Sequence, residues 1–151
     1  MTAYKTILVP LDGSTMAEQV LPEVKKIASS DSTLHLLQVV PTENVPYFPF
    51  TNPDKFHQEL KKEAESYMQE VEERLQRQGY TVDAVVRSGN PAEQIVNYAS
   101  ELNADIIAMT TLGAGGLAHW LLGSVAEKVV RHATTPVLLI HATQESVADR
   151  A

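Results

Sequence analysis

The sequence predicts an α/β fold, with one doubly wound domain built on a parallel five-stranded sheet. Short apolar segments of strand length alternate with longer segments whose apolar residues recur every three or four positions. This β-α-β-α-β-α-β-α-β alternation is typical of parallel strands joined by right-handed helical crossovers. The chain has 151 residues and 44% of them are hydrophobic, which suffices for one core. We expect the flavodoxin- or Rossmann-like strand order 3-2-1-4-5 in residues 1–143, followed by a polar tail at 144–151.

The first strand and the first helix open the chain. Residues 4–11 contain a nearly continuous apolar run, which is typical of a strand buried on both faces. The turn Asp12-Gly13-Ser14 follows, and its serine is a good helix N-cap. Pro22 lies inside the expected helix and predicts a kink or a shortened first turn. The apolar residues of that helix share one side: Met16, Val20, Val24, Ile27 and Ala28.

A second buried strand and a long amphipathic helix come next. Residues 33–40 form the strand. Residues 41–53 contain four prolines and three aromatic residues, so we expect an irregular connection with aromatic side chains packed against the body. Asn52-Pro53 predicts a helix start, and Gly79 ends that helix after Gln78. Its apolar stripe comprises Phe56, Leu60, Ala64, Met68 with the neighbouring Tyr67, Val71 and Leu75.

The third strand and the third helix carry clear local signals. Residues 81–87 alternate between apolar and polar side chains, which favours a strand at a sheet edge. Asn90 and Pro91 predict a helix start, with Glu93 in the position of a capping-box carboxylate. The expected inner face of this helix comprises Ile95, Val96, Ala99 and Leu102.

The last helix lies between two more strands. Residues 104–109 are expected as a buried strand and residues 136–141 as the last strand. Between them, Ser124 and Glu127 form a second capping-box pattern, in which Ser124 is the N-cap. The apolar positions of the helix that follows are Val125, Val129 and Val130.

The stretch from residue 109 to residue 127 is the strongest functional signal. A strand ends at Met109, a glycine-rich segment follows, and Gly123-Ser124 opens a helix. Glycines let the backbone approach a ligand, and the first N–H groups of a helix, together with its dipole, favour an anion. In the expected strand order the switch point lies between the first and fourth strands, so Asp12 and this segment face one crevice. The pattern predicts a phosphate- or nucleotide-binding site.

The charge and the composition exclude several classes. Lys and Arg number 12 against 19 Asp and Glu, a net charge of −7, which disfavours nucleic-acid binding. The chain has no cysteine, which excludes disulfides and thiolate chemistry. The N-terminal apolar run is too short for a signal sequence or a spanning helix, so we expect no membrane association and a cytoplasmic location. The sequence contains no recognisable motif of metal-ligating residues and no recognisable pair of a nucleophile and a base, so no catalytic residue is assigned.

Four segments resemble the universal stress protein family, in the right order and along nearly the whole chain. Residues 9–14 (VPLDGS) are similar to its opening strand and turn, and residues 36–40 to its second strand. Residues 89–95 (GNPAEQI) are similar to its G-x-P-x-E-x-I segment, and residues 123–138 to its closing helix and strand. The resemblance implies the adenine nucleotide alpha hydrolase-like form of the fold.

ATP-binding members of that family carry the motif G-x2-G-x9-G-[S/T]. The chain has Thr110, Gly113, Gly123 and Ser124 at the four positions, so only the first differs. Thr110 adds a side chain where the backbone passes the nucleotide, and its hydroxyl is a potential donor to it. Residues 110–122 contain no Lys or Arg, so phosphate charge is met by backbone donors, the helix dipole and any metal.

The resemblance also implies a role for each matching residue. Pro10, Asp12 and the backbone of Val39 would line the adenosine pocket, with Asp12 near the ribose or a Mg²⁺ ion. Met109 would pack on the adenine. The residues that would hold the phosphates are Gly113, Gly123, Ser124, Val125 and Ala126. The implied ligand is ATP, with ADP and AMP as alternatives.

Three functional hypotheses remain open at this point. The first is a homodimeric ATP-binding regulatory protein of the stress response, which pairs through residues 136–141 because an exposed apolar edge strand is usually covered. The second is a dimeric scaffold of the same family that binds no nucleotide. The third is a slow ATPase, although no group that would orient water is visible. A flavin carrier is a weaker fourth option.

Overall fold

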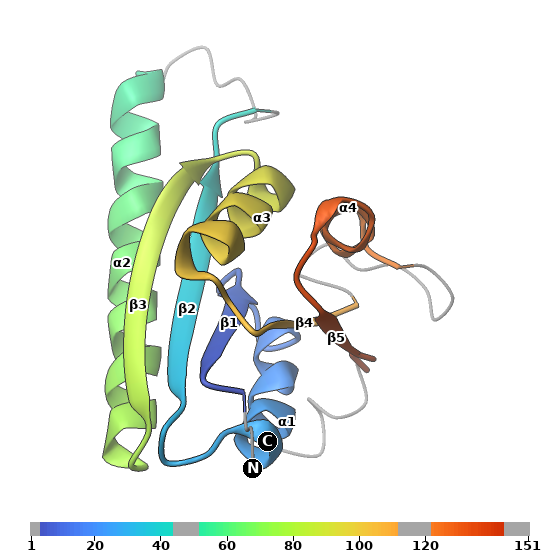
Figure 1. Cartoon of the computed structure of the whole chain (residues 1–151). Coiled ribbons are helices and arrows are strands. Elements are labelled where there is room, and N and C mark those ends of the chain that lie inside the picture. Colours follow the sequence, from blue (N-terminus) through green and yellow to red (C-terminus); the bar gives the residue numbers. More distant parts are fainter. Residues whose placement is uncertain (1–3, 44–51, 112–121, 144–151) are drawn as a thin grey trace.

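The computed structural model describes residues 4–43, 52–111 and 122–143 of the chain (Figure 1). The five strands form one parallel sheet in the order β3-β2-β1-β4-β5, which confirms the predicted order 3-2-1-4-5. The strands are β1 (Thr6–Leu11), β2 (Thr33–Pro41), β3 (Thr81–Gly89), β4 (Ile106–Thr110) and β5 (Val137–Ile140). The helices are η1 (Ala17–Gln19), α1 (Val20–Ile27), α2 (Pro53–Arg77), α3 (Pro91–Leu102) and α4 (Ser124–His132).

Two helices cover each face of the sheet, so the sheet is doubly wound. One core cluster joins Ile7 and Val9 of β1 to α1 and α2, and contains Val24 and Met68. The other joins Leu8 of β1 and neighbouring strands to α3 and α4. Successive residues of β1 therefore alternate between two buried faces, which explains its continuous apolar run. Figure 1 shows the α2 side and the α3–α4 side separated by the strands.

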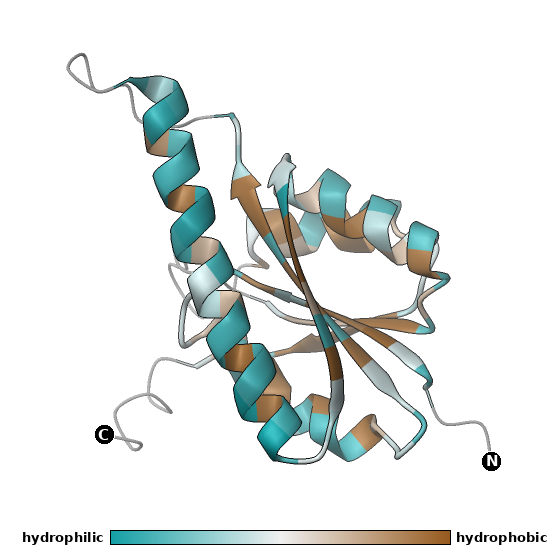
Figure 2. Cartoon of the chain, turned by 90° about the vertical axis from the view of Figure 1, so that its left-hand side faces the viewer, coloured by the Kyte–Doolittle hydropathy of each residue, from teal (hydrophilic) through white to brown (hydrophobic). Residues whose placement is uncertain are grey.

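The long helix α2 follows its sequence signals. The Asn52 side chain accepts a hydrogen bond from the Asp54 N–H at 3.0 Å, and Pro53 is the first helical residue. Gly79 ends the helix region with φ +95°, a conformation that favours glycine. Figure 2 shows a mostly hydrophilic helix along which hydrophobic residues recur, and the buried ones are Ala64, Met68, Val71 and Leu75. The N-terminal turns of α2 extend beyond β2 and β3 (Figure 1), at the end of the sheet where the strands finish.

Helix α3 also begins as predicted. The Asn90 side chain accepts from the Glu93 N–H at 3.1 Å. Its inner face includes Ile95 and Ala99, as expected, and also Tyr98, which the sequence interpretation omitted. Asn103 ends the helix with a left-handed φ of 50°. The preceding strand β3 lies at a sheet edge, as predicted from its alternating side chains.

The first helix starts later than its apolar spacing suggests. The Ser14 Oγ accepts from the Ala17 N–H at 3.1 Å, and a short 3-10 turn, η1, precedes α1. Pro22 then falls in the first turn of α1, where its missing N–H costs no helical bond. This arrangement confirms the shortened first turn.

Two predictions for α4 are wrong. The N-cap is Gly123 rather than Ser124, which already has helical geometry as the first residue of the helix. A serine in the first helical position cannot bond the N3 amide as an N-cap does. Val130 is 45% exposed and is not a core position, because it lies one helical step away from the buried Val129.

Some predictions fall outside the described residues. They concern the aromatic residues of 44–51, the glycine-rich residues of 112–121, including Gly113, and the tail at 144–151. Of the helices in the described ranges, none combines the length and the apolar character needed to cross a membrane.

Candidate functional site

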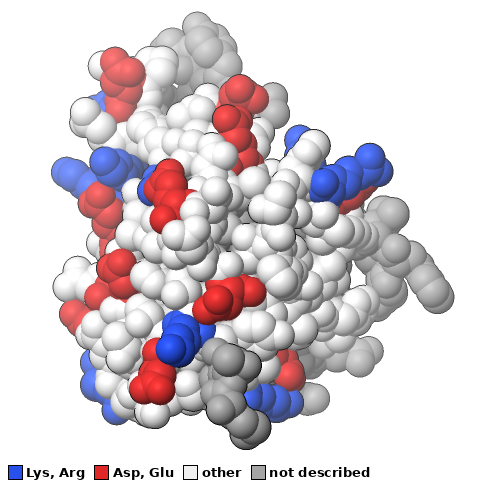
Figure 3. Space-filling view, viewed as in Figure 1, with Lys and Arg blue, Asp and Glu red and all other residues white. Residues whose placement is uncertain are grey.

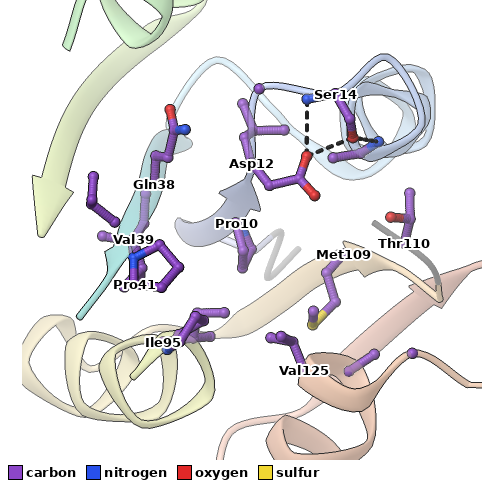
Figure 4. A pocket seen from close by; sticks show the side chains of 18 of the residues that line it. Pro10, Asp12, Ser14, Gln38, Val39, Pro41, Ile95, Met109, Thr110 and Val125 are labelled. Carbon is purple, nitrogen blue, oxygen red and sulfur yellow. Dashed lines mark hydrogen bonds between the residues drawn. The ribbon is translucent and has the colours of Figure 1, made fainter. Parts of the chain in front are cut away.

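The switch point of the sheet opens into a cleft at the carboxyl ends of the strands. β1 pairs with β4 only at Ile7–Ile106 and Leu8–Ile107, although both strands continue for three more residues. β1 pairs with β2 as far as Leu11 and Gln38. The ends of β1 and β4 therefore diverge and leave a cleft of about 930 Å³ between them (Figure 4).

Nine of the ten predicted site residues line this cleft. They come from the ends of β1, β2 and β4 and from the start of α4: Pro10, Asp12, Val39, Met109, Thr110, Gly123, Ser124, Val125 and Ala126. The tenth, Gly113, lies outside the described residues. The turn after β1 and the start of α4 are distant in sequence, yet they border one space. This is the convergence that the strand order predicted.

The turn after β1 holds the Asp12 carboxylate in place. Asp12 Oδ1 accepts from the Ser14 N–H at 2.9 Å and from the Ser14 hydroxyl at 2.5 Å, and Ser14 Oγ in turn accepts from the Ala17 N–H. Figure 4 shows these bonds at the rim of the cleft. The Asp12 residue is exposed, and carboxylate oxygens accept hydrogen bonds from hydroxyl groups and ligate cations.

The start of α4 presents backbone donors to the same cleft. The Gly123 N–H donates to the Thr111 carbonyl at 2.7 Å, and the first helical bond runs from Glu127 N–H to the Gly123 carbonyl at 2.9 Å. The intervening amides belong to Ser124, Val125 and Ala126, which have no helical acceptor because they form the first turn. Amides of this kind, together with the positive end of the helix dipole, favour an anion.

The floor of the cleft is an apolar slot. Figure 4 shows Pro10, Met109 and Ile95 directed toward one space between β1, β4 and α3. Val39 and Pro41 close the slot on the β2 side. Met109 is 6% exposed and belongs to the buried core between the sheet and helices α3 and α4, so the floor of the cleft is well packed. A flat apolar ring system fits between such side chains.

Sequence reasoning missed the residues that reach the cleft only through tertiary structure. Ile95 was assigned to the core, and it borders the slot as well. Gln38 ends near the Asp12 turn, and its Oε1 is buried with no hydrogen-bond partner among the described residues. Leu60, Glu63 and Tyr67 line the cleft from α2. Apolar spacing marks the inner face of a helix, but it does not say which turn reaches a sheet end.

A partly buried polar contact holds helix α2 against η1 beside the cleft. The Tyr67 hydroxyl donates to Glu18 Oε2 at 2.8 Å, and Arg74 pairs with the same carboxylate. Burial, and next the hydrogen bond to Glu18, raise the pKa of Tyr67 well above its usual range. The hydroxyl therefore remains a donor at neutral pH and ties α2 to η1 beside the cleft.

The charged side chains that line the cleft are acidic. Within the described ranges these are Asp12 and Glu63, and no Lys or Arg joins them. Figure 3 shows both signs scattered over one face of the molecule, without a gathered basic patch. The described part of the chain also holds no cluster of three metal-ligating side chains. Within the described residues, a divalent ion at Asp12 would thus need further ligands such as waters or the phosphates of a bound ligand.

The fold and the cleft define a doubly wound α/β protein with a ligand site at its topological switch point. Residues 3–141 match the family model for the universal stress protein family. The chain therefore belongs to the universal stress protein family, which confirms the resemblance found in the sequence.

Individual relatives match over most of their length. Universal stress protein MJ0531 of Methanocaldococcus jannaschii is 32% identical over 139 residues, covering 91% of this chain and 82% of that protein. YxiE of Bacillus subtilis is 30% identical over 146 residues, covering 91% and 99%. The solved structure of MJ0577, from Methanocaldococcus jannaschii, has a TM-score of 0.82 at 32% identity, covering 95% and 99%. A universal stress protein in complex with cAMP has a TM-score of 0.67 at 25% identity, covering 94% and 100%.

Proposed function

We propose that this chain is a cytoplasmic regulatory protein of the stress response that binds an adenine nucleotide in the switch-point cleft and works as a homodimer. One observation carries the proposal: the described residues that the family motif singles out line one cleft at the end of the sheet. The candidate ligands are ATP, ADP and AMP, with Mg²⁺ at Asp12 where a metal accompanies the phosphates. In support, one structural relative is described in complex with cAMP, an adenine nucleotide.

Each part of the cleft suits one part of such a ligand. The apolar slot between Val39, Ile95 and Met109 takes the adenine ring. The Asp12 carboxylate accepts from ribose hydroxyls at the rim. The amides at the start of α4 take a phosphate, and the Ser124 hydroxyl, which does not cap the helix, adds a further donor.

Calorimetry with AMP, ADP and ATP tests the proposal, together with mass spectrometry of small molecules that co-purify with the protein. The test variant is Gly123→Val, which places a branched side chain on the cleft wall. Gly123 has φ −59°, so valine fits the backbone and the variant should fold. We expect its affinity to fall at least about tenfold, equivalent to ~1.4 kcal/mol.

Ser100→Val is the matched control, because Ser100 is exposed on α3 and does not line the cleft. It should retain the affinity of the unmodified chain. Equal affinities of the Gly123→Val and Ser100→Val variants would contradict the placement of the nucleotide. The absence of heat with every nucleotide at millimolar concentration would contradict nucleotide binding altogether.

The sheet edge at β5 is the proposed dimer interface. β5 lies at the end of the strand order and pairs with β4 on one side. All four of its residues are apolar and partly exposed. A second copy of the chain is the partner that would cover this edge, because unprotected apolar edge strands promote association.

The acidic lining of the cleft favours one alternative, a dimeric scaffold of the same family that binds no nucleotide. Asp12 and Glu63 would repel phosphate, and among the described residues no Lys or Arg lines the cleft to offset them. The calorimetric experiment separates the two functions, since the scaffold predicts no heat while the dimer remains.

A further inference from the structure

The charge of the cleft bears on which nucleotide fits it. Among the described lining residues, two carry charge, and both Asp12 and Glu63 are negative. Residues 44–51 contain no charged residue, and residues 112–121 contain one histidine but no Lys or Arg. Wherever these two segments lie, they bring no Lys or Arg to the ligand. Residues 144–151 hold one arginine together with two acidic residues.

Among the described residues, the backbone donors that the cleft offers to a phosphate lie in one place, the first turn of α4. Ser124, Val125 and Ala126 contribute the amides of the first turn of α4. The Gly123 amide is already committed to the Thr111 carbonyl. The Thr111 hydroxyl accepts a weak hydrogen bond from the Ala142 N–H at 3.4 Å. A second and a third phosphate would therefore add negative charge beside a wall that, in its described part, has helix and amide dipoles but no Lys or Arg.

We propose that the cleft selects adenine nucleotides with a single phosphate, AMP or its cyclic form, against ATP. This inference rests on the proposed function, because it concerns the same site. AMP and cAMP place one phosphate at the start of α4 and keep the remaining charge low. ATP brings two more phosphates into the cleft that Asp12 and Glu63 line, so the repulsion grows with each one.

The sign of the salt dependence is a specific consequence. A phosphate site built from Lys and Arg loses affinity as salt rises, because screening weakens attraction. In this cleft the long-range electrostatic interaction between the acidic side chains and a polyphosphate is repulsive. Salt screens that repulsion, so the affinity for ATP should rise with the salt concentration. AMP, with less charge, should respond little.

Calorimetric titration of the full chain with AMP, cAMP, ADP and ATP in EDTA tests the selectivity. We expect AMP to bind at least about tenfold more tightly than ATP, with ADP between them. Between about 20 mM and about 300 mM salt, the ATP affinity should rise. Separate titrations with AMP and with cAMP show which monophosphate the cleft prefers. Mg²⁺ should improve ATP binding and leave AMP nearly unchanged.

A cation placed on the cleft wall should reverse the preference. Leu122 lines the cleft beside Gly123 and is 36% exposed, so Leu122→Lys leaves the core intact. We expect this variant to bind ATP about tenfold more tightly, with a smaller gain for AMP. Ser100→Lys adds the same charge on the exposed side of α3 and should leave the ATP-to-AMP ratio unchanged.

The outcomes separate this inference from the proposed function. If ATP binds in EDTA as tightly as AMP, or if Leu122→Lys leaves the ratio unchanged, the selectivity is overturned while nucleotide binding stands. If no nucleotide binds at millimolar concentration, both proposals fail.

Discussion

The Gly123 N–H donates to the Thr111 carbonyl at 2.7 Å, which ties the chain entering α4 to the chain leaving β4. The Thr111 N–H donates in turn to the Ile140 carbonyl at the end of β5. The mouth of the cleft is thus fixed by backbone bonds on both sides of the glycine-rich segment. Gly123 is the N-cap of α4 and its N–H is bonded to Thr111, so the amides without a helical acceptor begin at Ser124.

Ser124→Ala should have little effect on stability, because Ser124 is not the N-cap of α4. We expect the free energy of unfolding to change by less than about 0.5 kcal/mol, as measured by urea denaturation. Asn90→Ala is the comparison, since Asn90 does cap α3 through the Glu93 N–H, and it should cost about 1 kcal/mol. If the two variants lost the same free energy of unfolding, Ser124 would have to be regarded as the N-cap of α4.

Asp12→Asn should preserve the turn after β1 and remove its charge. The asparagine Oδ1 can still accept from the Ser14 N–H and hydroxyl, so stability should remain close to that of the unmodified chain. Asp12→Ala removes the acceptor and should cost about 1–2 kcal/mol of unfolding free energy. Thermal and urea unfolding of both variants measure this. If Asn destabilises as much as Ala, the turn depends on the charge and not on the acceptor.

Tyr67 should make stability fall at alkaline pH. Its pKa is raised in the folded state above the usual value of about 10, so the unfolded chain releases this proton first as the pH rises. The stabilising contribution is complete below about pH 10 and is lost above it. Unfolding measured between pH 8 and about pH 11 should fall less steeply for Tyr67→Phe than for the unmodified chain.

The exposed Tyr4 supplies the control for this experiment. Tyr4→Phe should keep the steep alkaline loss of the unmodified chain. A Tyr67→Phe profile that coincides with the Tyr4→Phe profile would show that the hydrogen bond to Glu18 does not hold the proton.

Leu138→Lys should separate the proposed dimer. Leu138 lies in the partly exposed edge strand β5, where a lysine opposes edge-to-edge pairing. Sedimentation should give a dimer for the unmodified chain and a folded monomer for the variant, with circular dichroism as the check on folding. Ser100→Lys should remain dimeric. A monomer at tens of micromolar for the unmodified chain would refute the interface.

Local signals in the sequence predicted most of the fold. Asn52-Pro53 and Asn90-Pro91 mark helix starts because an amide side chain and a proline satisfy the open end of a helix within a few residues. The alternation of residues 81–87 placed β3 at an edge. The N-cap of α4 was harder to predict, because glycine and serine are both good N-caps. Only the backbone geometry shows that Gly123 rather than Ser124 is the cap.

The candidate site was predictable where it depends on topology. The strand order places the ends of β1 and β4 together, so Asp12 and Gly123 could be assigned to one crevice from the sequence. The sequence did not allow the same assignment for Ile95 and Tyr67, because their position in the cleft depends on how far α3 and α2 extend along the sheet. It did not allow it for Gln38 of β2 either. Periodicity gives the face of a helix and not its offset along a neighbour.

An amide NMR titration of the chain with AMP tests the central claim most directly. The account predicts saturable shifts of the Ser124, Val125 and Ala126 amides and of Val39, with β3 nearly unchanged. Shifts confined to other surfaces, or none at millimolar AMP, would contradict it.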